Sequence, residues 1–320
     1  MPRISSMTCC MMLSALTTNC AAQKGPAGLQ CSPSSRSLGT VSRQLTADDV
    51  PIVFMHGMAG FDQVAGYDYF YGVLEALAAD CRRAFATRVD PLNTVVRRAE
   101  QVSAQIDDIL AKTGASQVDI IAHSQGGLDA RYLITHLGYG DRIRTLVTIA
   151  TPHHGTLVAD AALGWVSDRS AGAQATFDLI DWLGSHATGT DVDVQGQVWG
   201  LTRRYVEGTF NPTTLDDPRV RYYSYAGLTQ ASPFVDHDNV DIVNPSLLPA
   251  YVILTRLEGE NDGLVSVASA KWGSFLGVLP ADHMDEIGLP FGVTGGPFDH
   301  IAFYRALARF LDNKGPAPTR

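Results

Sequence analysis

The segment from residue 118 to 126 constrains the fold of this chain more than any other part. An apolar run at 118–121 leads into Ala-His-Ser-Gln-Gly at 122–126. A small residue two positions before a serine and a glycine two positions after it, between a strand and a helix, form the pattern of a nucleophile elbow. Ala122 stands where glycine is more common, and Gly126 meets the need for a small residue. The pattern predicts that the Ser124 hydroxyl stands above a sheet edge, beside the next backbone amides.

Short β-rich runs alternate with amphipathic helical patterns from residue 51 onward. Strands are expected at 51–55, 118–122, 145–149 and 219–226, with a further apolar run at 275–279. Helices are expected at 75–83, 98–113, 125–137 and 301–310. This alternation predicts an α/β protein of the α/β-hydrolase fold, with a mostly parallel central sheet and helices on both faces.

Residues from about 156 to 212 interrupt that alternation with two apolar, helical-looking stretches. An insertion placed after the strand that follows the elbow is typical of a lid or a wall of an acyl pocket. The alternative is a pair of ordinary helices that cover the sheet. We expect one catalytic domain over 47–320 that includes this insertion.

The N-terminal region has the character of a targeting segment. Arg3 precedes a fairly apolar stretch and then small residues up to Ala22, as in a secretory signal, so we expect a signal peptide at 1–22 and a flexible segment at 23–46. A cytosolic tail is the alternative, and Cys20 is a less favoured candidate for lipid anchoring. Cys81 stands alone in the folded region, which excludes an internal disulfide there and favours a packed thiol.

The charge and hydropathy of the chain exclude several classes of partner. Its 320 residues carry a formal net charge of −9, with a pI near 5.4, which argues against nucleic acid. No run reaches the roughly 18 consecutive apolar residues of a transmembrane span.

A serine nucleophile requires a base, an acid that orients the base, and donors for an oxyanion. The base should follow Ser124 in the sequence; His283, in a polar loop, is favoured over His300, while His153 and His154 are further candidates near the site. The acid is expected at Asp262, in an Asn-Asp-Gly turn, rather than at the neighbouring carboxylates Glu258 and Glu260.

The oxyanion hole requires two backbone N–H donors. One donor is expected from Gln125, directly after the nucleophile. The other is expected from Met58, in the His-Gly-Met-Ala-Gly loop that follows the first core strand.

Together these motifs resemble those of the secreted bacterial triacylglycerol lipases of the Pseudomonas and Burkholderia type. The resemblance covers about residues 50 to 310 and is weak in the middle third. It is carried by the oxyanion loop at 51–72, the elbow at 120–132, Thr-Pro-His-His-Gly at 151–155, Asn-Asp-Gly-Leu-Val at 261–265 and His-Met-Asp-Glu at 283–286. The resemblance implies Ser124, Asp262 and His283 as the triad, and Met58 and Gln125 as oxyanion donors.

The resemblance also implies a structural calcium ion near the histidine loop. It implies no cofactor for the chemical reaction. Asp285 matches one ligand of that site, but Asn244 stands where the family has a second aspartate, and Leu289 where it has glutamine. Because Ca²⁺ prefers anionic oxygen, we expect a weakened or lost site. The family's disulfide is absent, since Ala268 stands at one expected position. A secretion foldase is a further partner that the resemblance implies.

The sequence therefore predicts a serine carboxylic ester hydrolase, in first place a triacylglycerol lipase that acts on acyl esters, including those at an oil–water interface. A short-chain esterase or polyester depolymerase on the same scaffold is the alternative, since the pocket decides the substrate. A non-catalytic binding protein of this fold is the remote alternative, since it would be expected to have lost part of the triad.

Overall fold

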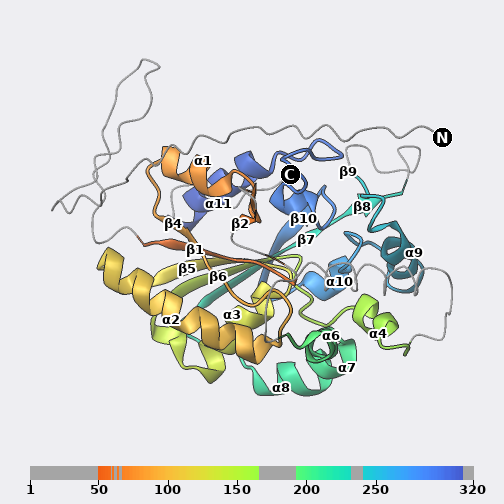
Figure 1. Cartoon of the computed structure of the whole chain (residues 1–320), viewed down its shortest axis with the longest axis horizontal. Helices are drawn as coiled ribbons and strands as arrows, with labels where there is room; N and C mark the ends of the chain where they lie inside the picture. The colour runs from red at the N-terminus through yellow and green to blue at the C-terminus, as the bar shows by residue number, and fades with distance from the viewer. Residues whose placement is uncertain are drawn as a thin grey trace, which may run out of the picture.

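A six-stranded parallel sheet lies at the centre of the molecule (Figure 1). The computed structural model describes residues 50–58, 60, 63–64, 67–165, 192–231 and 241–312. Every neighbouring pair in the strand order β10-β7-β6-β5-β1-β4 is parallel. The strands are β1 (Ile52–Met55), β4 (Ala84–Ala86), β5 (Val118–His123), β6 (Ile143–Ile149), β7 (Arg221–Gly227) and β10 (Ser274–Leu279). The predicted parallel sheet is confirmed.

Helices cover both faces of this sheet, as predicted (Figure 1). Alternate strand residues point to opposite faces. Phe54 and Ile121 therefore pack in the cluster that holds α1 (Val73–Ala79) and α11 (His300–Leu311). Their neighbours Val53 and Ile120 pack in the cluster that holds α2 (Val95–Thr113) and α3 (Gly126–His136). Burial on both faces explains why the strands are nearly continuous apolar runs rather than alternating ones.

The boundaries of α1 and α2 agree only in part with the sequence prediction, and α2 begins at Val95 rather than at residue 98. Thr94 caps the start of α2 by accepting a hydrogen bond from the Arg97 N–H, and Gly114, at φ 69°, ends the helix as predicted. By contrast, α1 ends at Ala79 rather than at residue 83. Cys81 lies beyond that end, buried and outside any disulfide, at φ 57°. The chain turns there into the short edge strand β4, which the sequence analysis did not predict.

The part of the insertion that the structure describes is helical. It contains α4 (Leu157–Ala162), α6 (Val194–Leu201), α7 (Arg203–Tyr205), the π-helical turn Val206–Phe210 and α8 (Asn211–Thr213), with no strand among residues 156–165 and 192–212. Residues of α4 and α6 share an apolar cluster with Leu128 of α3. The predicted signal peptide with Cys20, the flexible segment at 23–46 and the middle of the insertion lie outside the described residues.

Smaller elements follow the insertion, among them a separate two-stranded sheet of β8 and β9. They are β8 (Thr229–Gln230), β9 (Asp241–Ile242), α9 (Leu248–Leu257), α10 (Val267–Ala270) and the turn Asp285–Ile287; the ribbon β2 (Gln63–Val64) and β3 (Tyr67–Asp68) precedes α1. None of the helices in the described residues has the length and apolar character needed to cross a membrane.

Candidate active site

Ser124 occupies a strained turn between β5 and α3. Its φ is 55°, in the left-handed region that non-glycine residues rarely adopt. Two hydrogen bonds hold the turn: the Ser124 N–H donates to the Ile149 carbonyl at 2.9 Å, and the Thr151 hydroxyl donates to the Ser124 carbonyl at 2.7 Å. A strained backbone persists only where its surroundings impose it, and such residues cluster at active sites. The predicted elbow geometry is therefore present.

Small residues around Ser124 are required by close backbone approach. A Cβ on Gly126 would lie 2.7 Å from the Met55 carbonyl oxygen and 2.8 Å from that of His56. A Cβ on Gly57 would lie 2.6 Å from Ser124 Cβ and 3.1 Å from its Oγ. The loop that follows β1 thus passes directly beside the serine hydroxyl.

Asp262 and His283 form a buried pair. The Asp262 Oδ2 atom lies 2.8 Å from His283 Nδ1, and the His283 backbone N–H donates to the Asp262 carbonyl at 2.9 Å. The other carboxylate oxygen accepts the N–H groups of Leu264 at 2.8 Å and Val265 at 2.7 Å, in the turn that the sequence indicated. Asp262 is fully buried, and these four contacts fix both the carboxylate and the imidazole.

The other candidate bases and acids have different partners. The imidazole of His300 contacts the Tyr71 carbonyl at 2.9 Å, at the start of α11. His153 is buried against the Thr148 hydroxyl at 2.9 Å, which removes it from the reacting groups. Glu258 accepts a hydrogen bond from Arg203, and Glu260 is exposed.

Ser124 lies near the Asp262–His283 pair without being hydrogen-bonded to it. The imidazole of His123, the residue before the serine, has its centroid 4.5 Å from that of His283. Among the described residues, the Ser124 hydroxyl has no hydrogen-bond partner. In free enzymes such contacts are often long and shorten only when substrate is bound.

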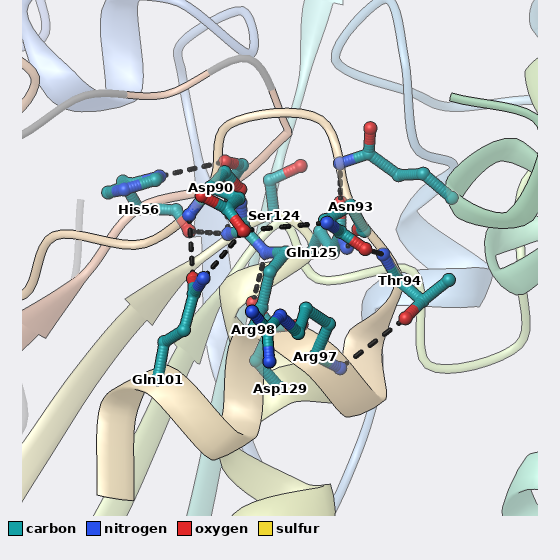
Figure 2. A network of polar contacts seen from close by, with 12 residues as sticks. His56, Asp90, Asn93, Thr94, Arg97, Arg98, Gln101, Ser124, Gln125 and Asp129 are labelled. Carbon is teal, nitrogen blue, oxygen red and sulfur yellow. Dashed lines mark hydrogen bonds and ion pairs between the residues drawn. The ribbon is translucent and has the colours of Figure 1, made fainter. Parts of the chain in front are cut away.

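A buried arginine holds the loop beside the serine (Figure 2). Arg98, on α2, is fully buried and donates through Nε to Asp129 on α3 at 2.7 Å. Its remaining nitrogens donate to three carbonyl oxygens, of Asp90 at 2.8 Å, His56 at 2.7 Å and Gly57 at 3.2 Å. Burial raises the pKa of Asp129 to about 6 despite this partner. One guanidinium therefore joins the loop after β1 to the helix that begins at the elbow.

Met58 follows Gly57 in the loop that Arg98 holds, and Gln125 follows Ser124 at the start of α3. Among the described residues, neither backbone N–H has a hydrogen-bond partner, so both remain available as donors. The Gln125 side chain is fully buried; its Nε2 donates to the Asn93 carbonyl at 3.1 Å, and its Oε1 accepts from Gln197 at 2.6 Å. The sequence analysis assigned no role to Arg98 or Gln197.

A second buried network lies behind the Asp262–His283 pair. His123 contacts the Tyr69 hydroxyl at 2.8 Å through Nδ1 and a Glu286 carboxyl oxygen at 2.9 Å through Nε2. Burial lowers the pKa of His123 and raises that of Glu286, with the Asp262 charge adding to the rise for Glu286. These directions favour neutral forms of both side chains. Glu286 belongs to the His-Met-Asp-Glu motif and His123 to the elbow motif, but neither motif predicted that the two side chains meet.

Asp285, one of the calcium ligands expected from the sequence, lies in a buried group of carboxylates. The Asn244 side-chain oxygen accepts hydrogen bonds from the N–H and hydroxyl of Ser246, and the Asn244 backbone N–H donates to Asp282 at 2.7 Å. Asp241 and Asp282 complete this buried group, whose ligand atoms lie within 4.8 Å of one another. Burial and the charge of Asp282 raise the pKa of Asp285 to about 8.

Comparison with known proteins places the chain in a family. A triacylglycerol lipase of Vibrio cholerae is 30% identical over 285 residues, which are 83% of this chain and 88% of that protein. The chain belongs to the triacylglycerol lipase family. A triacylglycerol lipase of Burkholderia plantarii is 26% identical over 338 residues, covering 91% of this chain and 93% of the relative. A family model described as palmitoyl protein thioesterase matches residues 51–190.

Solved structures agree on the fold. A metagenomic carboxyl esterase superposes with a TM-score of 0.63 at 18% identity, over 88% of this chain and 80% of that one. The mature form of a Bacillus licheniformis lipase gives 0.57 at 22% identity, over 75% and 86%. The predicted α/β-hydrolase fold is confirmed, and the chain is an ester hydrolase.

Proposed function

We propose that this lipase uses Ser124, Asp262 and His283 as its catalytic triad and cleaves acyl esters of triacylglycerol. The observation that supports the triad best is the buried Asp262–His283 hydrogen bond, at 2.8 Å, beside the strained Ser124 turn. Family membership supports the substrate class.

In this proposal Ser124 Oγ attacks the ester carbonyl while His283 takes its proton and later protonates the leaving alcohol. Asp262 holds the imidazole through Nδ1 and stabilises the imidazolium that forms. Water, activated by the same imidazole, then attacks the acyl-enzyme and releases the fatty acid. The N–H groups of Met58 and Gln125 stabilise the oxyanion, which is worth roughly 2.7–4 kcal/mol per donor.

The surface and the N-terminal sequence support further parts of the proposal. Trp165 and Trp199, on the insertion, are 45% and 38% exposed, and their rings contact each other. Large exposed apolar side chains suit contact with an oil–water interface. The signal-like residues 1–22 support export, with a secretion foldase as the partner for folding.

The buried carboxylates are suited to a structural calcium ion. Asp241, Asp282 and Asp285 offer anionic oxygens, which Ca²⁺ prefers. A cation would offset both the burial and the repulsion from Asp282, which raise the pKa of Asp285. Because Asp285 lies two residues after His283, an ion here would hold the histidine loop in place. The ion takes no part in the chemistry.

The deciding experiment compares initial rates on p-nitrophenyl esters from acetate to palmitate for the wild type and Ser124→Ala. We expect rates that rise toward medium or long chains, and no turnover by the variant at unchanged melting temperature. Turnover by Ser124→Ala would refute the nucleophile. Activity confined to the acetate and butyrate esters would change the proposed function from lipase to short-chain esterase or polyester depolymerase.

A further inference from the structure

Helix α6 of the insertion is hydrogen-bonded to the residue that follows the nucleophile. We propose that Gln197, on α6, is a positioning residue that holds the oxyanion hole in its working geometry. This inference rests on the proposed function, in which the Gln125 N–H is one of the two oxyanion donors.

The contact between the two glutamines leaves Gln125 little freedom to move. Gln197 is 1% exposed, and its Nε2 donates both to Gln125 Oε1 at 2.6 Å and to the Pro91 carbonyl at 3.1 Å. Gln125 in turn donates to the Asn93 carbonyl at 3.1 Å. The side-chain amide of Gln125 is thus held by hydrogen bonds at both its oxygen and its nitrogen. Because the backbone N–H of the same residue is the proposed oxyanion donor, fixing this side chain restricts the position of the donor.

The same helix also contributes to the apolar cluster that lies beside Met58, the other proposed donor. Met58 packs against the apolar cluster to which α6 contributes Val198 and Leu201. The start of α6 is tied to the loop before α2, because the Asp193 N–H donates to the Leu92 carbonyl at 3.1 Å. Helix α6 is therefore hydrogen-bonded to the side chain of Gln125 and contributes to the apolar cluster against which Met58 packs.

A role in packing alone does not explain a glutamine at this position. Gln197 Oε1 is buried and has no hydrogen-bond partner among the described residues. A buried acceptor without a partner lowers stability, and an apolar side chain would avoid that loss. What glutamine supplies here, and an apolar residue cannot, is the pair of donated hydrogen bonds to Gln125 and to the Pro91 carbonyl.

A small displacement of an oxyanion donor is expected to affect the rate strongly. The donor must lie within about 2.7–3.1 Å of the developing oxyanion, and a shift of about 1 Å costs roughly 100-fold in rate. We expect a smaller shift when Gln197 is lost, and hence a fall in kcat of about 10-fold with KM within about 2-fold.

The test compares Gln197→Met with Gln195→Met, a control on the exposed face of the same helix, in the full chain. A fluorescent phosphonate that labels the nucleophile measures the concentration of competent active sites. Dividing the rate by this concentration gives kcat per site, to which misfolded protein does not contribute. We expect kcat per site to fall about 10-fold in Gln197→Met only. Inhibition by an alkyl boronate, whose adduct mimics the oxyanion, should weaken by a similar factor.

A double substitution tests whether the effect passes through Gln125. If it does, Gln125→Met with Gln197→Met should match Gln125→Met alone within about 2-fold. Unchanged kcat per site and unchanged boronate affinity in Gln197→Met would overturn the inference. Failure of the phosphonate to label the wild type at Ser124 would instead overturn the proposed function, so the two failures are distinguishable.

Discussion

Replacing Arg98 by methionine should separate the stability of the fold from the geometry of the active site. In the single variant Arg98→Met, Asp129 remains buried without its partner, and the carbonyl groups of Asp90, His56 and Gly57 lose their donor. Removing one member of a buried ion pair costs about 3–5 kcal/mol. Since domains are stable by only about 5–15 kcal/mol, this variant should be close to unfolding.

The double variant Arg98→Met with Asp129→Leu should regain most of that stability. Replacing a buried ion pair by apolar residues of similar size is often neutral or stabilising. The carbonyl groups of His56 and Gly57 would still lack the donor that holds them, and their loop carries the proposed donor Met58. We therefore expect kcat to stay about 10- to 100-fold below the wild type at nearly unchanged KM.

The measurements are urea unfolding curves and kcat per phosphonate-labelled site for the wild type and for the single and double variants. Stability that recovers in the double variant without kcat would support the role of Arg98 in holding the loop. A double variant with wild-type kcat would refute it, because the loop would then hold its conformation alone.

Three further predictions follow from individual contacts. Gly57→Ala should lower kcat at least about 100-fold, because the added Cβ would collide with Ser124. Gly200→Ala, a control with open space around the added Cβ, should raise the urea midpoint slightly. Burial raises the pKa of Asp129 to about 6, so the protonated carboxyl stabilises the fold fully below about pH 4, and this stabilisation is lost as the pH rises through 6. Relative to Asp129→Asn, the free energy of unfolding of the wild type should fall by roughly 3 kcal/mol between about pH 4 and 6 and stay level above about pH 6. A difference between the two proteins' urea curves that does not change with pH would contradict this reasoning. Calcium should raise the melting temperature of the wild type and EDTA should lower it, while the melting temperature of Asp241→Asn should respond to neither. An equal response of both proteins would show that calcium binds at a different site.

The sequence predicted those parts of the site that depend on neighbouring residues. The elbow is a short motif, and Asp262 lies in a turn whose Asn-Asp-Gly chemistry is local. Arg98 and Gln197 were missed because the residues that they hold beside the nucleophile, His56 and Gln125, lie 42 and 72 positions away. Nothing near Arg98 or Gln197 in the sequence indicates such contacts. His153 was misleading, since a histidine after a strand resembles a site residue until its partner Thr148 is known.

The same distinction applies to the metal ligands and the sheet edge. Asn244 was matched to a family ligand by its position in the sequence, whereas Asp241 and Asp282, which lie near Asp285 in the fold, were not named as ligands. The edge strand β4 has only three residues, too few for a periodic pattern to be recognised.

The strained Ser124 turn also has a consequence for how the chain acquires activity during folding. Its backbone is held by the Ile149 carbonyl of β6, and Gly126 abuts the carbonyl groups that end β1, so three separate stretches of chain must meet before the turn is stable. Early helical structure alone cannot impose it. On refolding from urea, recovery of ester hydrolysis should lag behind recovery of the far-ultraviolet circular dichroism signal, which makes enzymatic activity a reporter of completed sheet assembly.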